Sequence, residues 1–159
     1  IVLHNISLPP GEFGGPYIDQ LFCNQLSAQE HPYFAQVHQM EVSSHCLIDR
    51  TGKITQYVAC DKRAWHAGRS SWRGRDNCND YSIGIELEGT DDLPYDQRQY
   101  VSLQMLILAL RQQYPGLLAD ALAGHEQIAP GRKTDPGPAF DWTKLRDLLA
   151  RGQSLSQTI

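Results

Sequence analysis

The alternation of apolar and polar positions predicts an N-terminal strand and a hairpin in the first half of the chain. Residues 1–5 favour a β-strand, which ends at the Pro- and Gly-rich segment 9–16. Residues 42–48 and 54–58 favour two further strands. The sequence Asp-Arg-Thr-Gly at 49–52 lies between them and is typical of a turn. These two strands therefore form the predicted hairpin.

Residues 81–88 alternate strictly and predict another strand. Its apolar face carries Ile83, Ile85 and Leu87. The opposite face carries Ser82, Gly84, Glu86 and Glu88. Because glycine and serine are small, we expect room above this polar face for something other than a side chain.

Apolar positions spaced by three and four residues predict helices in the second half. The stripe between residues 96 and 114 is the most regular, and Pro115-Gly116 ends it. A last helix is expected at about 141–150 and a short one at 17–23. Strands with helices packed on them predict an α/β (α+β) fold, a single domain with a central mixed sheet flanked by helices.

Composition places the chain among ordinary globular domains. It has 159 residues, 41% of them apolar and 20% charged, with a net charge of −4. A chain of this length buries its own core. No apolar run approaches the roughly 20 residues that span a bilayer, and the chain is too apolar to be disordered. The four cysteines include no C-x-x-C pair, so we expect reduced and mostly buried thiols.

The segment 61–75 is basic and aromatic, with five basic residues and one acid. Subtracting its charge of +4 from the total of −4 leaves −8 on the rest of the chain. Such an acidic body is a poor surface for a polyanion. We therefore expect no nucleic-acid partner and interpret the segment as a site for a small anionic ligand.

Histidines and acids near predicted loops suggest a metal site. The six histidines show neither an HExxH motif nor zinc-finger spacing, so spacing alone favours ordinary hydrogen-bonded histidines. His4, however, ends a predicted strand, and His125 and Asp135 bracket a Pro- and Gly-rich loop. Polar residues gathered on ordered loops beside a sheet more often form a binding or catalytic site than serve a purely structural role. Two imidazoles and a carboxylate form a donor set of catalytic zinc centres.

Four stretches of the chain resemble one enzyme family. They are residues 4–11, 63–68 (Arg-Ala-Trp-His-Ala-Gly), 79–91 and 128–142. In order and spacing they resemble the AmpD-type 1,6-anhydro-N-acetylmuramyl-L-alanine amidases, cytoplasmic zinc enzymes of Gram-negative cell-wall recycling. The resemblance implies a fold like that of peptidoglycan-recognition proteins. It also implies one amidase domain over residues 1–159 that lacks an N-terminal segment of about 30 residues.

The resemblance implies a role for each of five residues. His4, His125 and Asp135 become zinc ligands, Glu86 the acid/base residue, and Lys133 the cation that stabilises the oxyanion. Amide hydrolysis needs such a set, because a base must take the proton of water and positive charge must meet the developing oxyanion. Related phage amidases and recognition proteins typically have Cys as third ligand and a catalytic Tyr. Here these positions are Asp135 and Ser44.

Several assignments have rivals. Glu88 shares the strand face of Glu86 and is the alternative base, although the nearby acids at 91 and 92 suggest a solvated strand end. Lys133 is alternatively a surface lysine paired with a carboxylate. His45 and His66 are alternatively spare ligands, with a structural or substrate-contacting role favoured for both.

The implied substrate is an anhydro-muramyl peptide, whose stem carries several carboxylates. Arginine binds carboxylates through paired hydrogen bonds, and an indole offers a flat face to a sugar or peptide. We therefore expect Trp65 and Arg75 as contacts, together with Asn5 and His66. We expect a cytoplasmic monomer with no membrane partner, which acts in murein recycling and so affects β-lactamase induction. The alternatives are a non-catalytic peptidoglycan-binding module and a periplasmic amidase acting on intact peptidoglycan.

Overall fold

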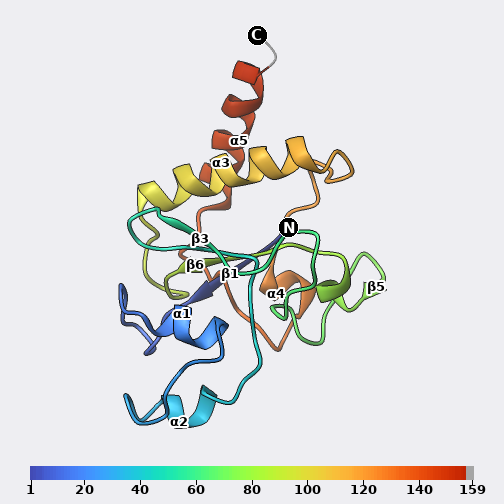
Figure 1. Ribbon diagram of the computed structural model, residues 1–159. Helices are drawn as coiled ribbons and strands as arrows, with labels where there is room; N and C mark the ends of the chain where they lie inside the picture. Colours follow the sequence, from blue (N-terminus) through green and yellow to red (C-terminus); the bar gives the residue numbers. More distant parts are fainter. Residues whose placement is uncertain (157–159) are drawn as a thin grey trace.

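The computed structural model describes residues 1–156, with side chains up to residue 152. A mixed five-stranded sheet with the order β3-β2-β6-β1-β7 lies at its centre (Figure 1). The bounds are β1 Val2–Ile6, β2 Cys46–Ile48, β3 Ile54–Gln56, β6 Gly84–Glu88 and β7 Ala123–Gly124. Strands β2 and β3 form the antiparallel pair, and the other neighbours are parallel. The predicted fold class is therefore confirmed.

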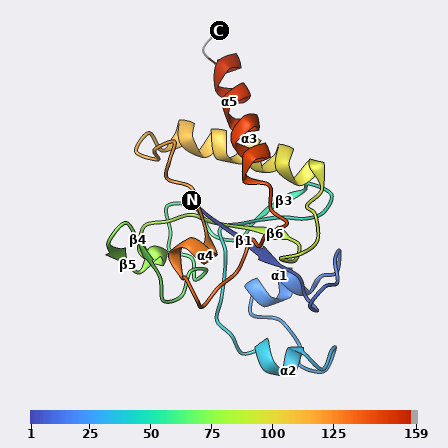
Figure 2. The ribbon, with the colours of Figure 1, turned by 180° about the vertical axis from the view of Figure 1, so that it is seen from behind.

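Helices cover both faces of the sheet. The long helices α3 Gln97–Gln113 and α5 Trp142–Ser156 cross on one side (Figures 1 and 2). The other side carries three short helices, α1 Tyr17–Phe22, α2 Phe34–Val37 and α4 His125–Ile128. A small hairpin of β4 Ser71–Trp72 and β5 Arg75–Asp76 and the 3-10 helix η1 Cys78–Asp80 precede β6.

Strand alternation divides the central strands between a core and a site. Leu3, Ile85 and Leu87 pack with residues of α3 and α5 in the main apolar core. The alternate positions of β1 and β6 face the other side, where the three short helices lie. Because β1 and β6 are parallel with His4 opposite Glu86, these two polar residues become neighbours on that second face.

Most predicted elements are present, with shifted ends. The hairpin forms, but its strands shorten to 46–48 and 54–56. Helix α3 begins at the predicted place because Asp96 caps it, its side chain accepting a hydrogen bond from the Arg98 backbone while Gln99 bonds back to the Asp96 N–H. Helix α5 extends past residue 150. The short elements α2, α4, β4, β5, β7 and η1 were not predicted, since they have too few residues to show a period.

The space above Gly84 holds a side chain, so the expected room on this face is limited to the part beside Glu86, where a pocket lies. A Cβ at Gly84 would collide with the imidazole of His66, which lies directly over it. Glu88 is also no solvated strand end, because it is only 3% exposed. All four cysteines are free thiols, of which Cys23 is exposed and Cys46 and Cys78 are buried.

None of the helices within residues 1–156 combines the length and the apolar character that crossing a bilayer requires.

Candidate active site

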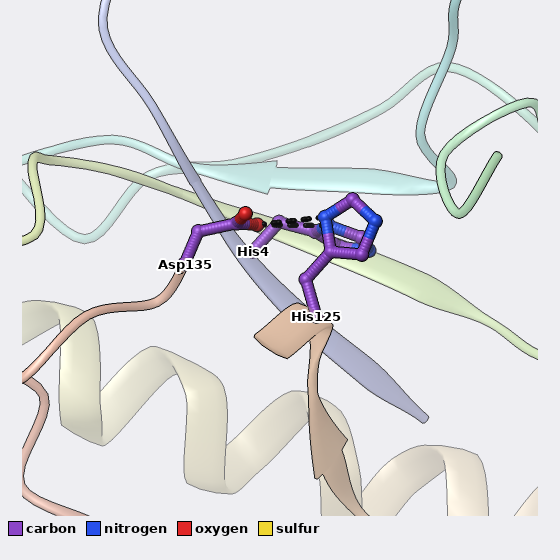
Figure 3. A group of neighbouring side chains, drawn as sticks. All are labelled: His4, His125 and Asp135. Atoms are coloured by element: carbon purple, nitrogen blue, oxygen red, sulfur yellow. Dashed lines mark hydrogen bonds and ion pairs between the residues drawn. The ribbon is translucent and has the colours of Figure 1, made fainter. Parts of the chain in front are cut away.

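Three potential metal ligands converge on the second face of the sheet. His4 comes from β1, His125 opens α4, and Asp135 lies on the loop that follows, so segments far apart in sequence meet here (Figure 3). The Nδ1 atoms of the two histidines are 2.9 Å apart, and the Asp135 Oδ2 is 3.2 Å from His4 Nδ1 and 3.0 Å from His125 Nδ1. The exposed fractions of the three residues are 1%, 3% and 9%.

The geometry and chemistry of this triad fit a zinc ion. Ligand atoms about 2.0–2.1 Å from a tetrahedral ion lie about 3.3 Å from one another. The measured separations of 2.9–3.2 Å are close to that value. Two imidazole nitrogens and one carboxylate oxygen leave a fourth tetrahedral position for water or substrate, as in catalytic zinc centres.

Electrostatics keep the triad ready to bind a cation. Burial lowers the pKa of His4 to about 4, so its imidazole is neutral near pH 7. Burial acts to raise the pKa of Asp135, but hydrogen bonds from His125 and His4 outweigh it and the pKa lies below its ordinary value. His4 is therefore a neutral imidazole and Asp135 a carboxylate near pH 7, which are the protonation states that metal ligands need.

The loop that carries Asp135 is tied to the rest of the fold. The backbone N–H of Glu126 donates to the Asp135 carbonyl at 3.0 Å. The Asn5 amide donates to Asp91 Oδ1 at 2.8 Å and to the Pro136 carbonyl at 3.2 Å, and the Tyr95 hydroxyl donates to the same carbonyl at 2.7 Å. These bonds hold the Asp135 carboxylate against the two histidines.

Glu86 lies beside the triad with an unusual environment for a carboxylate. It is 7% exposed, and its Oε2 forms no hydrogen bond with any described residue. Burial raises the pKa of Glu86 well above its ordinary value, Asp135 raises it further, and Lys133 opposes the shift. A carboxyl group with a raised pKa and a free oxygen is suited to take up and release a proton.

Glu88, the rival base, has both oxygens engaged. Its Oε1 accepts from the Gly14 backbone at 2.6 Å and its Oε2 from the Arg50 backbone at 3.0 Å. These bonds fix two loops against the sheet. Glu88 is absent from the lining of the pocket that contains the triad, whereas Glu86 is part of it.

Lys133 lies two residues before Asp135 and lines the same pocket. Its charge acts on both His4 and Glu86. Among the residues that the structure describes, no carboxylate forms a salt bridge with its ammonium group. The lysine is thus available to a ligand in the pocket, in contrast to the surface pair considered from the sequence.

The pocket above the triad has a volume of about 360 Å³ and two different walls. The polar wall consists of His4, Glu86, His125, Lys133 and Asp135. The apolar wall comes from α1, α2 and the segments next to them, and consists of Leu21, Phe22, Tyr33, Val37 and Met40. A cavity with a few convergent polar groups and an apolar side suits an amphipathic ligand.

The four expected substrate contacts are placed differently. Asn5, Trp65 and His66 line the pocket. Trp65 is 55% exposed, and the Arg63 guanidinium lies 3.8 Å from the centroid of its ring. Arg75 lies on the β4–β5 hairpin over the Tyr81 ring and is not part of the pocket lining.

Comparison with known proteins agrees with this geometry. The profile of Amidase_2, described as N-acetylmuramoyl-L-alanine amidase, matches residues 1–138. The chain belongs to this amidase family. The 1,6-anhydro-N-acetylmuramyl-L-alanine amidase AmpD of Escherichia coli K12 is 58% identical over 151 residues, which is 95% of this chain and 82% of that protein.

Solved structures support the same family. A crystal structure of a Se-Met AmpD derivative has a TM-score of 0.91 at 59% identity and covers 93% of this chain and 82% of that one. AmpDh3 from Pseudomonas aeruginosa in complex with anhydromuramic pentapeptide has a TM-score of 0.70 at 30% identity, covering 92% and 58%. Drosophila peptidoglycan recognition protein SD shares the fold, with a TM-score of 0.57 at 18% identity.

Sequence reasoning missed two parts of the amidase site. The apolar wall comes from elements of four and six residues, too short for a periodic pattern to reveal. The contacts that orient the two histidines were also missed; the one trace of them in the sequence is Gly84, whose lack of a side chain makes room for the His66 ring. His45 does not belong to the metal-ligand group, and its two ring nitrogens are occupied by the Gly84 N–H and the Lys62 carbonyl.

Proposed function

We propose that this amidase hydrolyses the amide bond between 1,6-anhydro-N-acetylmuramic acid and L-alanine of the stem peptide, and that zinc is its metal. The observation that carries the proposal is the meeting of the His4, His125 and Asp135 ligand atoms beside the unpaired carboxylate oxygen of Glu86. A metal site alone would also suit a binding protein. A buried acid/base group next to the open position suits hydrolysis.

Each polar residue of the site has a step to perform. Zinc, when bound by the triad, supplies Lewis acidity that polarises the scissile carbonyl and acidifies water. Glu86 takes the proton of the attacking water on its Oε2 and returns it to the leaving nitrogen of L-alanine. Lys133 places its ammonium charge where the carbonyl oxygen becomes negative. Burial of Glu86 raises its proton affinity, which favours uptake of the proton from the attacking water.

Similarity and pocket shape support the anhydro-muramyl substrate. The AmpD relatives are named for action on 1,6-anhydro-N-acetylmuramyl-L-alanine, and AmpDh3 is in complex with an anhydromuramic pentapeptide. The two-walled pocket offers polar groups to the amide and an apolar surface to the rest of the ligand. The exposed Trp65 indole offers a flat surface at the pocket edge.

Peptide release tests the proposal. Zinc-loaded protein is incubated with anhydro-muramyl tripeptide and, in parallel, with the ordinary muramyl tripeptide, and products are separated by chromatography and identified by mass. We expect free tripeptide from the anhydro substrate, and its release at least about 10²-fold slower from Glu86→Gln. Binding without turnover by the wild type would instead identify a non-catalytic peptidoglycan-binding module. Faster release from ordinary muramyl ends would contradict the substrate assignment.

The cellular setting rests on the sequence resemblance. We propose a monomer that works in the cytoplasm in murein recycling, with a periplasmic amidase as the alternative. Cell fractionation with an antibody against the native protein separates these two locations, and sedimentation of the purified protein measures its mass in solution. Recovery with the periplasmic fraction, or a sedimenting dimer, would contradict the respective proposal.

A further inference from the structure

Two consecutive residues contact the outward nitrogens of both histidine ligands. The Nε2 of His4 lies 2.9 Å from the Nδ1 of His66, and the Nε2 of His125 lies 3.0 Å from the carbonyl oxygen of Ala67. Both ligands turn Nδ1 toward the metal position, so with a metal bound the proton on each ring must sit on Nε2. The segment 66–67 therefore touches the atoms that decide the tautomer of each ligand.

For His125 the direction of the bond is fixed by chemistry. A carbonyl oxygen only accepts hydrogen bonds, so His125 donates from Nε2, and in its metal-binding form the ring keeps a lone pair on Nδ1. Arg132 donates to the same Ala67 carbonyl at 2.6 Å. This is an ordinary arrangement for a metal-binding histidine.

For His4 the partner is another imidazole, which can donate or accept. The surroundings of His66 decide between these directions. The Ser82 hydroxyl donates its only hydrogen to the Cys78 carbonyl at 2.6 Å, so its oxygen, 3.3 Å from His66 Nε2, is left to accept. His66 therefore carries its proton on Nε2, and its Nδ1 accepts from His4.

We propose that His66 is a positioning residue for the metal centre: by accepting a hydrogen bond from His4 Nε2, it holds the His4 lone pair on Nδ1 toward the metal. The proposal rests on the proposed metal site and assigns His66 to the ligand rather than to the substrate. It also excludes the role of spare ligand, because His66 contacts the nitrogen of His4 that faces away from the triad.

Two further features hold His66 in place for this role. The Asn79 Oδ1 accepts from the backbone N–H groups of both His66 and Ala67, at 3.1 and 2.7 Å, and Asn79 is only 6% exposed. The His66 ring also lies directly over Gly84, and it fits there only because glycine has no side chain. One buried amide thus fixes the segment that orients both histidines.

Zinc affinity separates this role from substrate contact. The zinc Kd of full-length protein is measured by competition with a chromophoric chelator for His66→Leu, His66→Asn and the wild type. Asn places an amide oxygen close to the position of Nδ1 and can accept from His4, whereas Leu cannot. We expect His66→Leu to weaken zinc binding about 10- to 100-fold and His66→Asn to restore most of the loss. His38→Leu, outside the pocket lining, serves as the matched control and should leave the Kd unchanged.

The tautomer itself is read by nuclear magnetic resonance. In 15N-labelled, zinc-loaded wild type, long-range proton–nitrogen correlations should show His66 protonated on Nε2 and unprotonated on Nδ1, which is the tautomer that can accept from His4 Nε2. This measurement uses only the wild type, and a His66 ring protonated on Nδ1 would overturn the proposal.

Three results on the variants would also overturn the proposal. One is unchanged zinc affinity in folded His66→Leu, another is a raised KM with normal zinc affinity, and the third is a His66→Asn variant as weak as His66→Leu. Failure of the proposed function looks different: the wild type would bind zinc and release no peptide, while the His66 results would stand.

Discussion

The two walls of the pocket are built on different principles. The polar wall begins on strands, where the β1–β6 register places His4 and Glu86 side by side, and continues on a loop tied down by hydrogen bonds. The apolar wall comes from a six-residue and a four-residue helix with their flanking segments, packed as a separate apolar cluster. We therefore expect substitutions in the polar wall to change the rate of the reaction, and substitutions in the apolar wall to change only the affinity for the ligand.

The strongest test of this contrast removes a metal ligand from the polar wall. Asp135→Ala should abolish zinc retention and lower kcat/KM at least about 10³-fold, since the metal supplies several kcal/mol of transition-state stabilisation. Zinc content after dialysis and peptide release are the measurements. Asp92→Ala, an exposed acid, is the control. A variant that lost activity while holding zinc with wild-type affinity would contradict the assignment of Asp135 as a ligand.

The next test separates the two glutamates of β6. Glu86→Gln should lower kcat about 10²- to 10⁴-fold with zinc content unchanged, because the amide cannot transfer the proton. Glu88→Gln should keep turnover and lower the free energy of unfolding by about 1 kcal/mol, because it weakens bonds to the loop backbones. Denaturant unfolding and steady-state kinetics measure the two effects. Equal losses of kcat in both variants would argue against Glu86 as the base.

Substitution of Lys133 tests whether its positive charge stabilises the transition state or also the bound substrate. Lys133→Met should lower kcat about 10²- to 10³-fold, the size expected for loss of an oxyanion-stabilising group. Zinc retention should stay normal, since the lysine is no ligand. Lys53→Met, at an exposed position in the hairpin turn, is the control for charge. A loss confined to KM would show that Lys133 binds the ground state instead.

The smallest effect is expected on the apolar wall. Met40 is 48% exposed and lines the pocket, so Met40→Ala should remove about 1 kcal/mol of apolar contact and raise KM about fivefold. The value of kcat and the zinc content should not change. Met105→Ala, on the exposed face of α3, removes the same side chain away from the pocket and is the control. A lower kcat with normal KM would mean that this wall also shapes the transition state.

The regular half of the site was accessible from the sequence. Strict alternation along 81–88 placed Glu86 and Glu88 on one face, and the resemblance supplied the ligands. The resemblance also favoured Glu86 over Glu88, but the physical reason lies in the loops around Gly14 and Arg50, whose N–H groups occupy Glu88. Backbone groups from distant segments leave no trace in the pattern of side chains.

The same limit explains the missed orientation of the histidines. Every residue type has a backbone carbonyl, so the identity of residue 67 does not indicate that its carbonyl accepts a hydrogen bond from His125. The role of His66 depends on the hydrogen of Ser82, whose partner Cys78 is set by a 3-10 turn. Such information appears only when the chain has folded.

The pairing of His4 with Glu86 across β1 and β6 has a consequence for how this chain tolerates change in length. Neighbouring residues of a strand face opposite sides, so inserting or deleting one residue would send an imidazole or a carboxylate into the core and bring Leu3 or Ile85 into the pocket. Substitutions in these strands alter one side chain at a time. A change in length exchanges the core-facing and pocket-facing residues of the whole strand at once. We therefore expect neither β1 nor β6 to tolerate an insertion or deletion of one residue.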